Sequence, residues 1–139
     1  MQQHAHRISI LTSGQDLYEF TDTVASWLHE TGIVRGLLTV FVRHTSASLL
    51  IQENADPDVL RDLLAFLRRL IPEGDPLYVH TIEGPDDMPA HVKAALTATS
   101  ISIPVESRRM VLGTWQGIYL FEHRRAPHMR QVSLHVIGE

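Results

Sequence analysis

Histidine and carboxylate side chains are the groups in this sequence best suited to chemistry. The 139 residues include nine histidines and 16 acidic residues but no cysteine. A zinc–thiolate site, an iron–sulfur cluster, a disulfide scaffold and a cysteine nucleophile are therefore excluded. The motifs of serine hydrolases, P-loop proteins, dinucleotide-binding proteins and HExxH metalloproteases are absent as well. The remaining candidates lie in three polar stretches at the ends of predicted elements, where functional sites commonly occur.

The first polar stretch follows a predicted strand at residues 36–44. His44 has the same parity as Val40 and Val42, so it should point toward the covered face of the sheet. There it could be a metal ligand or a general base. A core histidine bonded to a carbonyl is a slightly better interpretation. Thr45 and Ser46 are better interpreted as turn or strand residues than as nucleophiles, because no potential general base lies at a sequence spacing that would indicate a catalytic pair.

The second polar stretch joins His80 to an acidic loop before a predicted helix at residues 90–99. Asp86 or Asp87 would cap that helix, which is the usual role of such acids. His91 lies on the alanine-rich face of the helix and therefore faces packing rather than solvent. The helix dipole disfavours an imidazolium at this end, so the ring should be neutral and able to bind a metal ion. His80 is close enough in sequence to meet His91, although their spacing is not a recognised zinc motif.

The third polar stretch runs from Gly113 to Arg124. Its two glycines, Gly113 and Gly117, indicate a bulge, or the close approach of a ligand or another chain. In a ligand site, Trp115 could form an aromatic wall and Gln116 could supply a hydrogen-bonding amide. A kinked strand with a packed tryptophan is at least as good an interpretation. Arg124 could bind phosphate through its guanidinium fork, although arginines in turns are more often solvated.

Strands and helices alternate along the chain. Hydrophobic periodicity predicts helices at residues 21–31, 57–71 and 90–99, and strands at residues 6–12, 36–44, 46–52, 77–82, 101–105, 110–123 and 130–137. Asp56 as N-cap and Pro57 at the first helical position mark the start of the second helix. Hairpin-type connections in the last third favour an α+β fold, a largely antiparallel sheet or sandwich with two main helices and one short helix. The length fits one domain spanning residues 1–139.

Composition excludes several classes of protein. The chain is 44% hydrophobic and 20% charged with a net charge of −4, which is typical of a folded domain. An acidic chain without a long basic run argues against nucleic-acid binding. No apolar run approaches the roughly 20 residues of a membrane span, and the first seven residues lack the apolar segment of a secretory signal. We therefore expect a cytoplasmic protein with no membrane or nucleic-acid partner.

Four segments together resemble the YjbQ-like family, also called the secondary thiamine-phosphate synthase family. They are RHTSASL at residues 43–49, ENADPDV at 53–59, EGPDDMPAH at 83–91 and GTWQGIYLFEHR at 113–124. The resemblance extends from about Ile8 to Glu139. Four long motifs in the same order make it specific.

This resemblance implies a small α+β chain that assembles as a homotrimer, with the marked residues in clefts near subunit contacts. It also implies a divalent metal ion, zinc in the first place, with magnesium as the alternative for a pyrophosphate substrate. We assign the metal first to His44, His91 and His123. The further ligands or neighbours of the metal would be His80, Glu53 and Asp87. The residues expected to act in catalysis are His44, Glu53 and Asp87.

The family label implies a transferase that joins a thiazole phosphate to a pyrimidine pyrophosphate and releases pyrophosphate. Such a reaction requires cations near the leaving phosphates. The residues assigned to this small phosphorylated substrate are Arg43, Thr45, Ser46, Trp115, Gln116 and Arg124. Two alternatives stay open: a metal-dependent hydrolase or lyase for another phosphorylated or anionic metabolite, and a non-catalytic trimeric module that binds metal or a ligand.

One predicted strand is apolar on both faces. Trp115, Tyr119 and Phe121 alternate on one side, and Ile118 and Leu120 occupy the other. Such a strand must be covered on both faces, by a helix or by a neighbouring subunit. We expect a subunit contact at the aromatic face.

Overall fold

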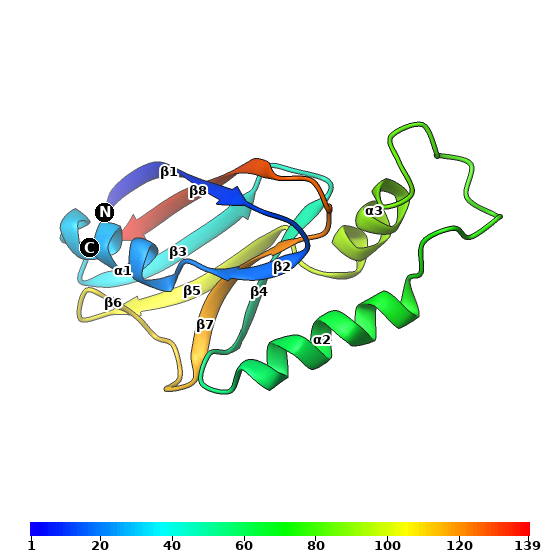
Figure 1. Cartoon of the computed structure of the whole chain (residues 1–139). Helices are drawn as coiled ribbons and strands as arrows, with labels where there is room; N and C mark the ends of the chain where they lie inside the picture. The colour runs from blue at the N-terminus through cyan, green and yellow to red at the C-terminus, as the bar shows by residue number, and fades with distance from the viewer.

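The computed structural model describes residues 1–139 and is built from antiparallel strands and three helices (Figure 1). The helices are α1 (Thr21–Thr31), α2 (Pro57–Leu70) and α3 (Asp87–Leu96). The strands are β1 (Gln2–Thr12), β2 (Asp16–Glu19), β3 (Arg35–Val42), β4 (Ala47–Glu53), β5 (Ser100–Glu106), β6 (Arg109–Met110), β7 (Gln116–Glu122) and β8 (His128–Gly138). Every strand pairing is antiparallel. The α+β fold predicted from the sequence is thus confirmed.

The strands form two sheets. The larger has the order β1-β8-β3-β5-β6 and the smaller has the order β2-β7-β4. The pairing of β1 with β8 places Gln2 opposite Gly138, so the two termini lie side by side at one end of the molecule (Figure 1).

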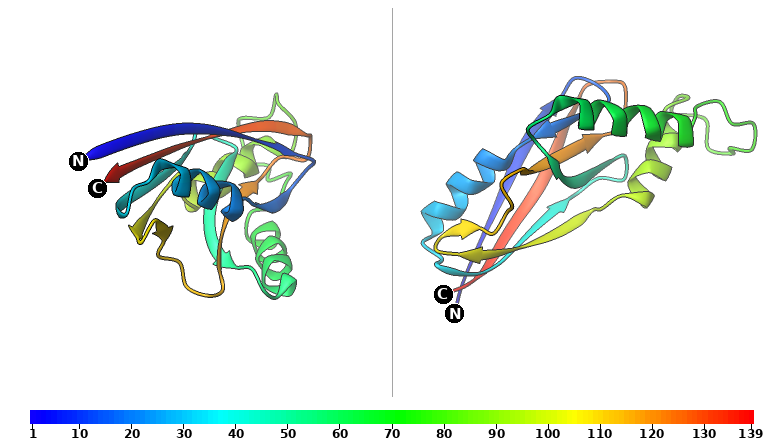
Figure 2. Two further views of the ribbon diagram at one scale, coloured as in Figure 1. Left: turned by 90° about the vertical axis from the view of Figure 1, so that its left-hand side faces the viewer. Right: turned by 90° about the horizontal axis from the view of Figure 1, so that it is seen from below.

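The main core lies on one face of the larger sheet. In β3, Leu38, Val40 and Val42 are buried, whereas Leu37 and Phe41 are nearly half exposed. This alternation is the period of a strand with one covered face. Side chains of α1 and of the smaller sheet join the same core cluster, so these two elements cover the face (Figure 2).

The helix α2 begins as the sequence predicts. The Oδ1 atom of Asp56 accepts a hydrogen bond from the backbone N–H of Asp58 at 2.9 Å, and Pro57 is the first helical residue. This side-chain cap satisfies a backbone donor that the helix itself leaves free.

One face of α2 covers the outer face of the smaller sheet. Tyr119 and Phe121 are only 3% and 2% exposed in the single chain. They form a small cluster with Leu17, against which three leucines of the helix pack: Leu60, Leu64 and Leu67. The expected subunit contact at these aromatic residues is therefore wrong, because a helix of the same chain covers them. Trp115 precedes β7 and is 61% exposed.

Residues 77–82 do not form the predicted strand. They belong to the loop between α2 and α3, which extends away from the two sheets (Figure 1). Leu77, Val79 and Ile82 are 85–95% exposed. Their apolar spacing imitates a strand, but no strand of this chain lies beside them to accept its hydrogen bonds.

Other elements also differ from the prediction. The single strand predicted at residues 110–123 is divided into β6 and β7, and the structure has an additional short strand, β2. β1 begins at Gln2 rather than at residue 6, and α3 spans Asp87–Leu96 rather than residues 90–99. None of the three helices is long and apolar enough to cross a membrane.

Candidate metal centre

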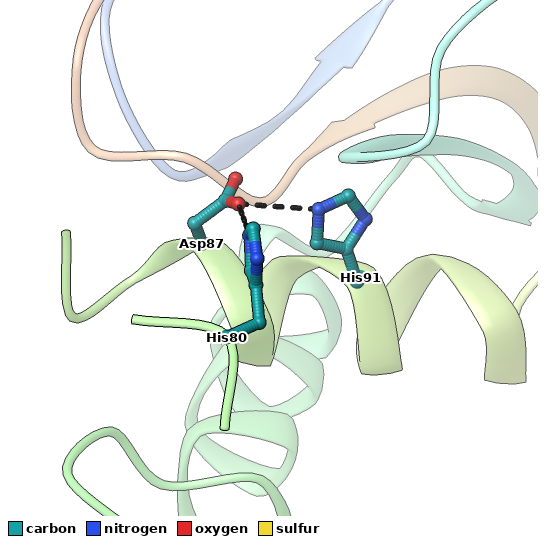
Figure 3. A group of neighbouring side chains, drawn as sticks. All are labelled: His80, Asp87 and His91. Atoms are coloured by element: carbon teal, nitrogen blue, oxygen red, sulfur yellow. Dashed lines mark hydrogen bonds and ion pairs between the residues drawn. The ribbon is translucent and has the colours of Figure 1, made fainter. Parts of the chain in front are cut away.

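The most compact group of potential metal ligands lies at the start of α3. Asp87 and His91 are one helical turn apart and share a face of the helix, and His80 reaches them from the preceding loop (Figure 3). One ligand atom from each of the three lies within 4.8 Å of the others. The same three residues are among the metal ligands, or neighbours of the metal, predicted from the sequence.

Both histidines converge on one oxygen of Asp87. The Nε2 atom of His80 lies 2.6 Å from Oδ2 of Asp87, and the Nε2 atom of His91 lies 3.2 Å from the same oxygen. The other carboxylate oxygen, Oδ1, is paired with Nη1 of Arg124 at 2.7 Å. The Asp87 side chain is only 3% exposed, whereas His80 and His91 are about one-third exposed, at 39% and 34%. The group therefore has a buried carboxylate and opens to solvent on its imidazole side.

The hydrogen bonds of His91 define its tautomer. Its Nδ1 atom lies 3.1 Å from the backbone carbonyl of Thr45. A carbonyl can only accept a hydrogen bond, so Nδ1 carries the proton. In a neutral ring, Nε2 then presents a lone pair toward an oxygen of Asp87. Two acceptors that face each other at 3.2 Å require a proton or a cation between them.

The carboxyl group of Asp87 is held in its ionised form. Burial alone would raise its pKa, but the hydrogen bond from His80 and the positive charge of Arg124 outweigh burial and lower it. Metal ligation requires a deprotonated carboxylate. The electrostatic environment of Asp87 thus suits this role.

Asp86 performs a different task from the one expected. It occupies the N-cap position of α3, yet neither it nor Asp87 makes a side-chain capping bond. Instead, Oδ2 of Asp86 accepts hydrogen bonds from Nε of Arg124 at 3.0 Å and from the backbone N–H of Arg125 at 2.9 Å. The expectation that one of these acids caps the helix is wrong, because the arginines compete successfully for the carboxylates.

The guanidinium of Arg124 is engaged within the chain. Besides its bonds to Asp86 and Asp87, it donates from Nη2 to the carbonyl of Glu83 at 2.9 Å. Its side chain is 16% exposed. The structure thus places Arg124 as a residue that orients Asp87, and its predicted contact with substrate stays a prediction.

His44 and His123 lie outside this group of ligand atoms. The Nε2 atom of His44 accepts a hydrogen bond from the backbone N–H of Gln131 at 2.8 Å. Its lone pair is therefore used by the backbone. Burial, followed by the nearby charge of Arg130, lowers the pKa of His44, so this ring is neutral. The expected bond to a carbonyl is thus replaced by one from an amide.

His123 is an almost completely buried neutral ring. It is 1% exposed, its Nε2 atom lies 2.9 Å from Oγ of Ser48, and its Nδ1 atom has no hydrogen-bond partner. Burial, helped by the charge of Lys93, lowers the pKa of His123 to about 3. The ring has the free nitrogen that a metal ligand needs, but it belongs to no group of three potential ligands.

A buried ion pair joins β7 and β8, and its residues are not among the candidates predicted from the sequence. Glu122 and Arg130 are 0% and 3% exposed and form a salt bridge, to which Thr12 adds a hydrogen bond of 2.6 Å from Oγ1 to Oε1. Arg130 also donates to Oγ of Ser46 at 3.0 Å. The sequence feature that could have predicted this pair is one charged residue at an inward-facing position in each of two otherwise apolar strands.

Other predicted site residues lie at the opposite end of the smaller sheet. Glu53 pairs with Gln116 in the ladder between β4 and β7, whereas Ala47 at the other end of that ladder pairs with Glu122. Six residue steps separate the ends, or about 20 Å of strand. Within one chain, Glu53, Gln116 and the neighbouring Trp115 therefore do not join the ligands on α3.

The remaining candidates lie near Thr45. Arg43 and Thr45 are exposed. Thr45 contributes its carbonyl to His91, as described above, while Ser46 contacts the buried Arg130. Gly117, interpreted as a bulge or a close approach, lies against the Glu19 side chain, which a Cβ atom at this position would meet at 2.6 Å.

The two histidines and Asp87 fit a divalent metal ion of the zinc type. Imidazole nitrogen and carboxylate oxygen are its ordinary ligands. Asp87 is oriented by Arg124, and His91 by the carbonyl of Thr45; metal-binding residues are commonly held in this way. The facing acceptors on Asp87 and His91 provide the place that a cation would occupy.

Comparison with known proteins agrees with the fold and the motifs. A family model described as UPF0047 protein YjbQ-like matches residues 6–139. A UPF0047 protein of Synechocystis is 53% identical, with the match covering 99% of this chain and 94% of that protein. The YjbQ protein of Escherichia coli O157:H7 is 38% identical over 95% of this chain and 96% of its own length.

A solved structure of a related protein has the same fold. A YjbQ/UPF0047-family protein of Clostridium acetobutylicum superimposes with a TM-score of 0.87 at 40% identity, and the match covers 95% of this chain and 99% of that one. The chain described here belongs to the YjbQ-like UPF0047 family.

Proposed function

We propose that this protein is a metal-dependent enzyme for a small phosphorylated metabolite. The observation that supports the proposal most strongly is the convergence of His80 and His91 on one oxygen of Asp87, whose other oxygen is held by Arg124. A structural ion pair would not need two partly exposed imidazoles on the same oxygen. A divalent metal site does use such a set.

His80, Asp87 and His91 would hold the metal ion. Three protein ligands leave a coordination position for water or a substrate oxygen, and the metal would act there as a Lewis acid. Arg124 would keep Asp87 ionised and fix its direction. The Thr45 carbonyl would keep the lone pair of His91 on Nε2. Metal binding would also require His80 to release the proton that it shares with Asp87 in this structure.

A hollow beside His80 offers room for a small substrate. It has a volume of about 270 Å³ and is lined by Gly74, Asp75, Tyr78, His80, Thr81, Gly84, Pro85 and Met88. This volume is near the lower end of the range for ligand pockets, about 300–1,000 Å³. It suits one ring or one phosphorylated fragment rather than a polymer.

The transfer of a pyrimidine unit to a thiazole phosphate is the first reaction to examine. The resemblance of the four motifs supports it. In that reaction the ring nitrogen of the thiazole would attack the pyrimidine methylene carbon and pyrophosphate would leave. The metal ion would neutralise charge on the departing phosphates.

A second candidate is a metal-dependent hydrolase or lyase for another phosphorylated metabolite. The observation in its favour is that Arg124 already donates to Asp86, Asp87 and Glu83. It therefore has little capacity left for a leaving pyrophosphate. A non-catalytic metal-binding module would have the same ligands but no turnover.

We also propose that the protein acts as a homotrimer. His80 lies between apolar residues that are almost fully exposed in the single chain, Val79 at 95% and Ile82 at 90%. Large exposed apolar groups of this kind mark subunit contacts. A neighbouring chain that covered them would fix the position of His80. It could also bring its own Glu53 and Trp115 toward the metal.

The decisive assay measures pyrophosphate release and thiamine phosphate formation with zinc, magnesium or manganese. The wild-type protein is compared with His91→Ala, and His29→Ala serves as a control on the exposed face of α1. A panel of phosphomonoesters and pyrophosphates tests the hydrolase. Metal-dependent turnover of any of these substrates that is lost only in His91→Ala supports the proposal. Tightly bound metal without turnover of any substrate would overturn the enzymatic function.

A further inference from the structure

A second cavity lies on the other side of α3 from the candidate metal centre. Its volume is about 260 Å³, and its lining comes from four separate parts of the chain: Gln15, Arg68, Ile71, Pro72, Glu73, Lys93 and Arg125. Lys93 follows His91 by two residues, which is about 200° around a helix. The cavity and the metal ligands therefore occupy opposite faces of the same helix.

Lys93 is the only lysine in the chain, and it is buried. The residue is 6% exposed, yet its ammonium group makes no salt bridge and donates no hydrogen bond. The stem of Lys93 is buried but its Nζ atom keeps access to solvent, because the fully buried side-chain atoms without a partner are Nε2 of His4 and Nδ1 of His123. A poorly solvated charge without a partner still costs free energy. An anion in the cavity would supply the partner that this ammonium lacks.

The charges that line the cavity are mostly positive. Arg68, Lys93 and Arg125 contribute three positive charges, and Glu73 contributes one negative charge, which leaves a net charge of +2. The whole chain has a net charge of −4, so the cavity lining is positive although the chain as a whole is negative. Glu73 pairs with Arg125 alone. Lys93 and Arg68 are left without a carboxylate.

We propose that this cavity binds a phosphate or pyrophosphate group, held by Lys93 at its base and by Arg68 and Arg125 at its rim. Arginine forks and a lysine ammonium are the side chains that recognise phosphate oxygens. Only one of the lining residues, the buried Ile71, is a large apolar residue, so the cavity offers little to an apolar ligand. The site is separate from the metal centre and does not depend on it.

The test exploits the single lysine. Protein labelled with ¹³C-lysine gives one set of Cε–Hε signals, and these report directly on the cavity. Inorganic phosphate and pyrophosphate are titrated at constant ionic strength, with sodium chloride as the reference salt. We expect a saturable shift that corresponds to one site per chain. The same titration after chelator treatment should give the same affinity, which separates this site from the metal centre.

Two variants make the proposal falsifiable. Arg68→Ala removes an exposed residue at the rim of the cavity on α2, and we expect about fivefold weaker binding. Arg61→Ala removes a cation from the same helix outside the cavity and should leave the affinity unchanged. The proposal is overturned by a shift that is linear and equal to that caused by chloride. It is equally overturned if Arg68→Ala binds phosphate as tightly as the wild type.

Discussion

At the scale of single residues, the hydrogen-bond partners of each histidine determine what its imidazole can do. Four of the histidines singled out from the sequence occupy three different environments. His80 and His91 face a carboxylate, His44 accepts from a backbone amide, and His123 is buried beside Ser48. The contacts of His80 and His91 with Asp87 are local, so the sequence could suggest them. The partners of His44 and His123 come from distant parts of the chain, and no local pattern reveals them.

Arg124 should influence metal binding without touching the metal. It fixes Asp87 through Oδ1 and keeps the carboxylate ionised. We expect Arg124→Ala to weaken zinc binding by about 10–100-fold, which is typical when a residue that orients a ligand is lost. Competition with a chromogenic chelator measures this affinity. Arg109→Ala, an exposed change in β6, is the control, and equal affinities for wild type and Arg124→Ala would contradict this role.

His123 should make the protein less stable in mild acid. The pKa of its imidazole falls from 6.5 to about 3 on folding. Below pH 6.5 the unfolded chain therefore takes up a proton that the folded chain does not. The free energy of unfolding then decreases as the pH falls toward 3, by up to about 1.4 kcal/mol per pH unit from this group.

Urea unfolding between pH 7 and pH 5 tests this dependence. His123→Gln keeps a polar partner for Ser48 but cannot take up the proton, so its stability should fall less steeply with pH than that of the wild type. His29→Gln changes an exposed histidine and should leave the slope intact. Identical slopes for wild type and His123→Gln would show that the buried ring is not responsible.

At the scale of elements, local signals marked the ends of α1 and α2 correctly but failed at residues 77–82 and at the cap of α3. Asp56 and Pro57 mark the start of α2, and Gly32 ends α1 in the left-handed conformation that favours glycine, with φ of 77°. The order of the two sheets and the cover of Tyr119 by α2 depend on contacts between distant segments. The sequence could state that both faces of β7 need cover, but not which element supplies it.

The N-cap of α2 offers a direct test at this scale. Asp56→Ala removes the bond to the N–H of Asp58 and should lower the free energy of unfolding by about 1 kcal/mol. Urea unfolding at one fixed protein concentration measures the change. Asp62→Ala removes an exposed acid from the same helix without touching the cap. Equal stabilities for Asp56→Ala and Asp62→Ala would contradict the capping role.

At the scale of the whole molecule, several apolar surfaces have no cover within the chain. The loop between α2 and α3 exposes Leu77, Val79 and Ile82, and the outer face of the larger sheet exposes Phe41. His80 lies within that same loop, and its side chain bonds to the chain only at Asp87. Assembly and metal binding should therefore depend on each other.

Sedimentation analysis tests this coupling. We expect the wild-type protein to sediment as a trimer at micromolar concentration. Val79→Asp together with Ile82→Asp should shift it toward monomers and weaken zinc binding. Thr23→Asp, an added charge on the exposed side of α1, should change neither property. A wild-type monomer, or a monomeric double variant with unchanged zinc affinity, would contradict the coupling.

The most direct test of the central claim is the metal content of the protein. Untagged wild type, His91→Ala and the control His29→Ala are purified without chelator and analysed by inductively coupled plasma mass spectrometry, followed by a zinc titration of each. We expect about one transition-metal ion per chain in the wild type and the control, and its loss in a folded His91→Ala variant. A wild type that neither contains metal nor binds added zinc would contradict the metal centre, and so would a His91→Ala variant that binds zinc as tightly as the wild type.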